Sequence, residues 1–387
     1  MTDNADGMPV HYIEDTAAFE LLCEQWRSKE CLVVDTEFIR TNTFYARMGL
    51  LQIADDEAIY LIDPLRIDNW EAFTTLLNTP SCCFVIHSCS EDLNLLQTFL
   101  GCLPASLFDT QLAASFLGLG FSVSYQALVS ELIGIDVAKG ETRSNWLQRP
   151  LTESQLLYAA NDVRYLLELY NILKQQLVEK NRLQWLDTEC MQLLETAQRS
   201  EVSKNWEFYY TGISNAWRLN DSGLEILQKL CYWREHKARN NNKPRSWIVK
   251  DAELLSLTKQ LSLLDVQSLT EMPSISEVDA RFLSRYSGEL LQVLKATDSD
   301  LGEIDREILN KPLGPVLRKK LKQCQEVVQT KAAQLEMAPE LIGRKKQLLE
   351  FLRDFERAGE IVWSGGLSGW RRQLLEPDFQ QIMSDEN

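Results

Sequence analysis

The sequence predicts an α/β domain with a mixed sheet, followed by two all-helical segments. Apolar runs rich in β-branched residues are typical of strands, and they occur only in the first part of the chain, at 31–38, 48–54, 58–63 and 82–87. Helical patterns lie between and after these runs, and beyond about residue 211 no strand pattern remains. Strands that come first and helices that pack afterwards are typical of an α/β domain.

Each helix of the first part is predicted from the spacing of its apolar residues. Four patterns precede residue 135, at 70–77, 91–100, 110–118 and 125–134. A longer helix is predicted from Thr152, a typical N-cap residue, to about Leu177. Its leucine, alanine and valine residues recur at helical spacing and form one apolar face.

The helical remainder divides into two segments of similar layout. The first has helical patterns at 223–239 and 250–261, separated by the polar break 240–247. The second has helical patterns at 314–335 and 339–359. Each segment therefore consists of a helix, a basic loop and a helix, which is a weak internal repeat. We expect three domains, at 1–205, 211–292 and 293–378.

The composition indicates a soluble globular protein. Of its 387 residues, 45% are hydrophobic and 25% are charged, which suits a chain that buries sizeable cores. No apolar run approaches the roughly 20 residues needed to cross a bilayer, and the first residues lack a secretory pattern. We therefore expect a cytoplasmic protein without a membrane partner. Nine cysteines without a C-x-x-C pair, and only three histidines, argue against a disulfide framework or a zinc ribbon.

The net charge of −16 argues, at first sight, against a nucleic-acid partner, because binding to phosphates needs Lys and Arg. The distribution of the charges changes that argument. Residues 1–200 hold 28 acids and 13 bases, a net of −15, whereas residues 201–250 hold 5 acids and 9 bases. Acids therefore crowd the first domain, and bases are concentrated in the helical segments.

Two acids lie at the end of the first predicted strand. Asp35 and Glu37 stand at positions i and i+2, so on a strand both carboxylates point to one face. Two convergent carboxylates beside an apolar core are costly unless a cation holds them, and Mg²⁺ prefers such oxygen ligands. A solvated strand end that leads into a turn is the alternative explanation of this tripeptide.

Two further positions carry matching chemistry. Asp92 follows the predicted strand 82–87, where functional groups of an α/β sheet gather, although a first-turn acid behind a Ser90 N-cap is an ordinary alternative. Tyr158 and Asp162 are four residues apart and share one helix face. A tyrosine at this position could orient a water molecule, and the alternative is that it is simply packed in the core. Four acids and a tyrosine in this order are together what a two-metal phosphodiester hydrolase requires.

These residues resemble the motifs of the DEDD superfamily of 3′→5′ exonucleases, in its tyrosine-containing branch. Longer blocks resemble the bacterial ribonuclease D family, namely VVDTEFIRTNTFYARMGLLQIA, HSCSEDLNLL, FDTQLAASFLG and LYAANDVRYLLELY. The two helical segments resemble the tandem HRDC-type domains of that family, and the resemblance covers essentially the whole chain. It implies a ribonuclease H-like mixed-sheet exonuclease domain followed by two all-α HRDC-type domains.

The same resemblance implies a 3′→5′ exoribonuclease that removes single nucleotides from RNA 3′ ends by two-metal-ion hydrolysis. It implies two divalent cations, Mg²⁺ or Mn²⁺, and RNA partners such as tRNA precursors and other structured RNAs with 3′ extensions. No obligatory protein partner is indicated. The residues implied are the metal ligands Asp35, Glu37, Asp92 and Asp162 and the water-orienting Tyr158.

Basic residues suggest where RNA binds. The polar segment 139–149, with Lys139 and Arg143, is predicted to be a loop that touches phosphate or a plain connector. In the helical segments, basic residues interleave with aromatic ones, which suits phosphate contact and base stacking, although solvated helix faces are an equal alternative. The candidates there are Lys229, Arg234, Lys237, Arg239, Lys243, Arg245, Arg318, Lys319 and Lys320.

Two other residues and two rival functions complete the expectations. Asp109 is expected to be structural or to support the metal ligands, and His87 to be packed or hydrogen-bonded rather than to bind metal. A DNA-directed 3′→5′ exonuclease of the same fold is one rival function, and a non-catalytic RNA-binding adaptor is the other. The sequence contains no G-x-x-x-x-G-K-[ST] element, so the chain is not itself a helicase.

Overall fold

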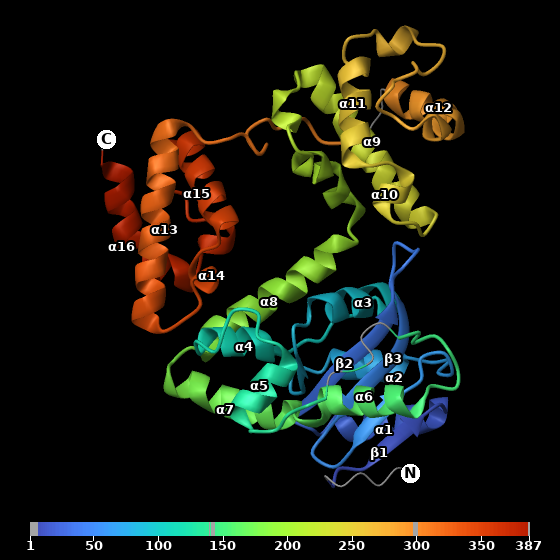
Figure 1. Cartoon of the computed structure of the whole chain (residues 1–387), viewed down its shortest axis with the longest axis vertical. Coiled ribbons are helices and arrows are strands. Elements are labelled where there is room, and N and C mark those ends of the chain that lie inside the picture. The colour runs from blue at the N-terminus through green and yellow to red at the C-terminus, as the bar shows by residue number, and fades with distance from the viewer. Residues whose placement is uncertain (1–6, 139, 141–143, 297–300, 386–387) are drawn as a thin grey trace. The chain divides into compact units, whose positions relative to one another are not determined.

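The computed structural model describes residues 7–138, 140, 144–296 and 301–385. The chain folds into two compact units, whose strands and helices are shown in Figure 1. The first unit consists of Met1–Ile39, Arg47–Gln198 and Leu313–Asn387. The second unit consists of Arg40–Ala46 and Arg199–Pro312. Each unit is therefore assembled from segments that are distant in sequence.

The first unit is built on a six-stranded sheet with the strand order β1-β4-β3-β2-β5-β6. β2 pairs antiparallel with β3 and parallel with β5, so the sheet is mixed, as predicted. The strands are β1 (Val10–Ile13), β2 (Cys31–Ile39), β3 (Arg47–Ala54), β4 (Ile59–Ile62), β5 (Cys83–Ile86) and β6 (Leu107–Asp109). The sequence analysis did not predict β1 and β6, because β6 has only three residues and the four residues of β1, VHYI, do not form a continuous apolar run as those of β4 and β5 do.

Helices cover this sheet, and two of them position the site described below. α6 packs against β2, β3 and β4, and α7 packs against β2 and β5. The sequence analysis did not predict α1 and α8. The helices of this part are α1 (Thr16–Trp26), α2 (Glu71–Leu77), α3 (Ser90–Leu100), α4 (Thr110–Phe116), α5 (Tyr125–Leu132), α6 (Glu153–Arg164), α7 (Leu166–Glu179) and α8 (Leu183–Ser200).

The prediction of a single long helix from Thr152 to about Leu177 is wrong, because the helix is interrupted at Tyr165, between α6 and α7. The Tyr125 hydroxyl lies at this break. It donates a hydrogen bond to the Asn161 carbonyl (2.7 Å) and accepts one from the Tyr165 amide (3.2 Å). That amide and that carbonyl are the pair that a continuous helix would join. An inserted hydroxyl therefore causes the break.

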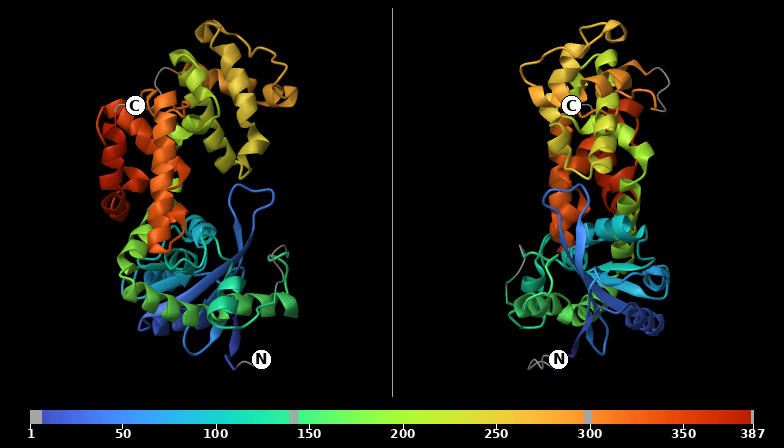
Figure 2. Two further views of the ribbon diagram at one scale, coloured as in Figure 1. Left: turned by 60° about the vertical axis from the view of Figure 1, so that its left-hand side comes forward. Right: turned by 90° about the vertical axis from the view of Figure 1, so that its right-hand side faces the viewer.

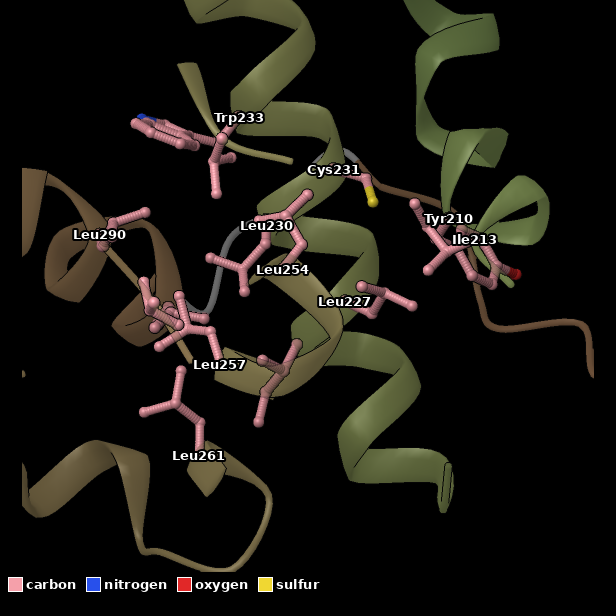
Figure 3. Packing of buried hydrophobic residues seen from close by; sticks show 14 of the residues in the cluster. Tyr210, Ile213, Leu227, Leu230, Cys231, Trp233, Leu254, Leu257, Leu261 and Leu290 are labelled. Carbon is pink, nitrogen blue, oxygen red and sulfur yellow. The ribbon is translucent and has the colours of Figure 1, made fainter. Parts of the chain in front are cut away.

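The second unit has its own hydrophobic core. Figure 3 shows Leu227 and Leu230 of one helix beside Leu254 and Leu257 of another, with Cys231 of the first helix turned toward Tyr210. These buried leucines follow helical spacing, which explains why the sequence indicated helices here. The unit contains α9 (Asp221–Asn240), α10 (Arg245–Ile248), α11 (Asp251–Leu261) and α12 (Ala280–Lys295), with a 3₁₀ helix at Ser203–Gly212 before them.

The remaining helices return to the first unit. α13 contacts α14, α15 and α16; Figure 1 shows α13 between α15 and α16, and the left view of Figure 2 shows the orange α13 beside the red C-terminal helices. These helices are α13 (Pro315–Leu335), α14 (Pro339–Ile342), α15 (Lys345–Ala358) and α16 (Trp370–Ser384). Trp370 of α16 stacks on Trp185 of α8, with ring centroids 4.8 Å apart. Within the described part of the chain, no helix combines the length and apolarity that a membrane span needs.

Candidate active site

β2 holds the first two acids on one face of the sheet. Asp35 and Glu37 alternate with the buried Thr36, as the period of a strand requires. Both carboxylates are half-buried. They lie beside Asp162 of α6, and one carboxylate oxygen from each of the three acids falls within 4.8 Å of the others. The sheet and the helix therefore bring together acids that are about 125 residues apart in sequence.

Asp92 joins this cluster from the first turn of α3, and its side chain is buried. The Thr36 hydroxyl donates a hydrogen bond to Asp92 Oδ1, which ties α3 to β2. Ser90 does not cap α3, because Cys89 holds the N-cap position and no side chain makes a capping bond there. The capping alternative for this segment is therefore not supported.

α6 supplies Tyr158 and Asp162 from one helix face. The helix begins at a capping box in which Thr152 and Gln155 satisfy each other's backbone amides, so the predicted N-cap is confirmed. Tyr158 hydrogen-bonds to Asp162, and its ring lies 6.1 Å from that of Trp146. The five candidate residues Asp35, Glu37, Asp92, Tyr158 and Asp162 line one pocket of about 410 Å³.

The electrostatics of this pocket favour a bound cation. Burial, reinforced by the charges of Asp162 and Asp92, raises the pKa of Glu37 to about 8. Burial raises the pKa of Asp92 and of Asp162 to about 7, and the pKa of Asp35 lies well above its ordinary value. Among the described residues, no lysine or arginine lines the pocket to neutralise these acids. Hard divalent cations with oxygen ligands therefore fit this set of donors.

Two neighbouring residues have structural partners. Asp109 accepts hydrogen bonds from the amides of Gln111 and Leu112, which caps α4, and from the Cys89 amide at 2.9 Å. It therefore fixes the turn that leads into α3 and Asp92. His87 Nε2 donates to the Val123 carbonyl (3.2 Å), and Nδ1 lies 2.9 Å from the Thr110 hydroxyl oxygen. His87 is packed and hydrogen-bonded, as expected.

Comparison with known proteins identifies the family. The curated ribonuclease D of Pseudomonas paraeruginosa is 38% identical over 367 residues, which cover 95% of each chain. The chain belongs to the ribonuclease D family. The ribonuclease D of Escherichia coli K12 is 32% identical over 379 residues, which cover 95% of this chain and 96% of that one. Family models described as 3′-5′ exonuclease and HRDC domain match residues 10–178 and 223–294.

A solved structure agrees with this membership. The crystal structure of Escherichia coli RNase D, described as an exoribonuclease involved in structured RNA processing, aligns with a TM-score of 0.81. The two sequences are 28% identical, and the alignment covers 98% of this chain and 100% of that one. As a member of the ribonuclease D family, the chain is a 3′→5′ exoribonuclease with an α/β exonuclease domain followed by a helical HRDC domain.

The structure does not support three of the basic residues that were expected to contact RNA. Arg234 is buried and bonds to Asp251 (2.6 Å), and Arg239 is buried and bonds to Glu235 (2.6 Å). Lys320 is buried too, and its ammonium donates to the Ile382 carbonyl (2.6 Å) near the end of α16. These cations already have partners inside the protein: Arg234 joins α9 to α11, Arg239 pairs within α9, and Lys320 of α13 is held by a carbonyl of α16.

The other basic residues that were expected to contact RNA differ in whether they already have partners within the protein. Lys229 donates to the carbonyl of Ala296 (2.7 Å), Lys237 pairs with Glu289 (2.7 Å), and Arg245 pairs with Glu235 (2.5 Å). Three are exposed, namely Lys243, Arg318 and Lys319. Lys139 and Arg143 lie outside the described residues. The sequence analysis also missed Tyr125, which lines the pocket, because a single sequence carries no signal for a hydroxyl inserted between two helices.

Proposed function

We propose that the acidic pocket is the active site, and that Asp35, Glu37, Asp92 and Asp162 hold two divalent cations, Mg²⁺ or Mn²⁺. The observation that carries the proposal is the convergence of four acids with raised pKa values on a pocket that no described basic residue neutralises. Cations bound there would activate water and stabilise the departing 3′ oxygen of the terminal phosphodiester. The acids would bind these cations in their ionised form, because carboxylate ligands bind without their protons.

Tyr158 orients the attacking water in this proposal. Burial and the charge of Asp162 raise the pKa of its hydroxyl above the ordinary value near 10, so the hydroxyl keeps its proton at neutral pH. A protonated hydroxyl can hold water in place but is a poor base. Glu37 additionally accepts a hydrogen bond from the terminal 3′ hydroxyl of the RNA. We include membership of the tyrosine-containing branch in the proposal, and a tyrosine four residues before the last acid supports it.

Substitution of the acids tests the assignment. Asp35→Ala and Asp162→Ala should lower Mg²⁺-dependent release of mononucleotides from a 3′-labelled RNA by at least about 100-fold. Tyr158→Phe should cause a smaller loss, about 10- to 100-fold, because the metal ligands remain. Glu131→Ala is the matched control, since Glu131 is an exposed acid on α5 outside the pocket. Near-normal activity of Asp35→Ala would refute the assignment, and internal cuts would refute the exonucleolytic mode.

We further propose that the natural substrates are tRNA precursors and other structured RNAs with 3′ extensions, processed in the cytoplasm without an obligatory protein partner. The described role of the E. coli enzyme in structured RNA processing supports the substrate class. Incubation with matched RNA and DNA oligonucleotides and a tRNA precursor, with products resolved by length, tests this choice. A clear preference for DNA would overturn it.

The domain limits 1–205, 211–292 and 293–378 are part of the proposal, and the last range is proposed as a second HRDC-like domain. The succession of the long helix α13, the short α14 and the helix α15, with the basic residues 344–346 at the start of α15, supports this interpretation. Two longer helices with basic residues near their connection also occur in the first helical segment.

A further inference from the structure

The HRDC domain contains a small pocket at which cations remain exposed, although most of its predicted RNA-contacting residues are paired. The pocket has a volume of about 240 Å³ and lies between α10, the start of α11 and the start of α12. Trp247 of α10 lines it and is 59% exposed. We call it the Trp247 pocket, and define it by Trp247, Lys250, Arg281, Phe282, Arg285 and Tyr286.

The floor of the Trp247 pocket is a packed aromatic cluster. Phe282 and Tyr286 are buried, with ring centroids 5.5 Å apart. Both rings pack edge-on against Trp233, at 6.0 Å and 5.3 Å. The Trp233 indole in turn donates a hydrogen bond to Glu289 (2.9 Å). The floor is therefore held in place by the core of the domain, and a ligand would not have to order it.

Exposed cations surround the exposed indole. Arg281 and Arg285 are four residues apart on α12 and thus share one helix face, and Lys250 precedes α11. All three are exposed, and none of them forms a salt bridge within the described part of the chain. A fourth cation, Lys243, lies with its ammonium 5.7 Å from the Trp247 ring centroid.

The two acids at the pocket serve the backbone. Glu253 accepts hydrogen bonds from the amides of Lys250 and Asp279, both at 3.1 Å. Asp279 accepts one from the Arg281 amide at 2.7 Å and caps α12. Their carboxylates are thus held at two helix N-termini, where negative charge is favoured, and the arginine side chains remain without acidic partners.

We propose that the Trp247 pocket binds one nucleotide of single-stranded RNA, with its base stacked on Trp247 and its flanking phosphates paired with Arg281 and Arg285. The inference rests on the exoribonuclease function and adds a site to it. An exposed aromatic ring among cations suits RNA, because every base has a face that stacks and every nucleotide carries a phosphate. A protein partner would need a larger apolar surface than one tryptophan provides.

Binding of RNA by the full-length protein tests the proposal. The dissociation constant of a fluorescent, unstructured RNA oligonucleotide is measured by anisotropy in EDTA, where no hydrolysis occurs. Trp247→Ala should weaken binding by at least about fivefold, and Trp247→Phe should restore part of the loss, since a ring still stacks. Arg281→Gln and Arg285→Gln should each weaken binding and reduce the slope of log affinity against log salt by about one.

Two variants of the same domain serve as controls. Lys259→Gln removes an exposed cation of α11, and Leu263→Ala removes an apolar side chain that is 79% exposed, and neither residue lines the pocket. Both should bind RNA as the unchanged protein does. The proposal would be overturned if Trp247→Ala bound RNA with the affinity of the unchanged protein, or if Trp247→Phe lost as much RNA affinity as Trp247→Ala. It would also be overturned if the variants bound RNA normally but no longer bound a protein partner. Failure of the unchanged protein to hydrolyse RNA would instead refute the exoribonuclease function.

Discussion

Partial burial, and then the charges of Asp162 and Asp92, raise the pKa of Glu37 to about 8. In the unfolded chain an ordinary glutamate has a pKa near 4.3. Between these values the folded state binds more protons than the unfolded state, so stability falls as the pH rises. The contribution of Glu37 to the free energy of unfolding is therefore fully present below about pH 4, and it is lost as the pH rises through about 8. Asp92 and Asp162, with pKa values of about 7, act in the same direction.

Thermal unfolding of the EDTA-treated protein tests this dependence. Glu37→Gln removes the titrating group, so its Tm minus that of the unchanged protein should increase between pH 5 and pH 8.5. Mg²⁺ should raise the Tm of the unchanged protein more at pH 8.5 than at pH 5, because cations compete with protons for the same oxygens. Glu131→Gln, an exposed change on α5, is the control. A Tm difference for Glu37→Gln that does not vary with pH would contradict the prediction.

The acids of the site could be predicted from the sequence, whereas their supports could not. Alternation on a strand indicates that Asp35 and Glu37 share one face, and helical spacing indicates the same for Tyr158 and Asp162. Thr36 and Asp109 act through hydrogen bonds to Asp92 and to the turn before it, and these bonds depend on tertiary contacts. Residue type and spacing do not encode such contacts.

At the scale of elements, the break between α6 and α7 fixes the direction of the helix that carries Asp162. The Tyr125 hydroxyl from α5 occupies the place of the hydrogen bond between the Tyr165 amide and the Asn161 carbonyl. These two backbone groups flank Asp162. The break therefore belongs to the proposed active site as much as to the fold.

Tyr125→Phe should let the two backbone groups bond directly and shift Asp162. We expect the rate of RNA hydrolysis to fall about tenfold or more, and the Mg²⁺ concentration for half-maximal rate to rise, because Asp162 is a proposed metal ligand and a small misplacement of a ligand is costly. Tyr170→Phe is the matched control, because its hydroxyl contacts Lys174 on the same helix and does not line the pocket. An unchanged Mg²⁺ requirement in Tyr125→Phe would contradict this role.

The sequence predicted most elements and failed at particular ones. β2 and β3 are long enough for their apolar runs to be recognised, whereas β6 has only three residues. The pattern from Thr152 onward continues at helical spacing across the break, because apolar periodicity does not record a hydroxyl from another element. Basic residues such as Arg234 and Lys320 looked like solvated or RNA-facing cations, and only the fold shows that they are buried.

At the scale of the whole molecule, one buried ion pair joins α16 to α8 within the first unit. Arg371 contacts Glu189 with two hydrogen bonds, at 2.6 Å and 2.7 Å, and its third nitrogen donates to the Leu341 carbonyl (2.6 Å). Arg371 is 3% exposed. Its removal would leave the Leu341 carbonyl without this donor, and would leave the partly buried Glu189 carboxylate without its ion pair, with the Trp370 indole nitrogen (3.0 Å) still donating to it.

Arg371→Ala should destabilise the first unit by about 3 kcal/mol, measured as a lower Tm and a lower denaturant midpoint. Arg372→Ala provides the control at the neighbouring position, since Arg372 is exposed and pairs with Glu376 on its own helix. It should leave the Tm unchanged. Equal Tm values for the two variants would show that the contact with α8 contributes nothing to stability.

The return of α16 to α8 also sets the order of events during synthesis. α8 ends at residue 200 and α16 begins at residue 370, so 169 residues are translated between the two helices that carry the Trp185–Trp370 stack. At about 5–20 residues per second, that interval lasts roughly 10–30 s. During this time the nascent chain exposes a tryptophan and an unpaired Glu189 on α8, and this surface is open to chaperones until α16 leaves the ribosome and covers it.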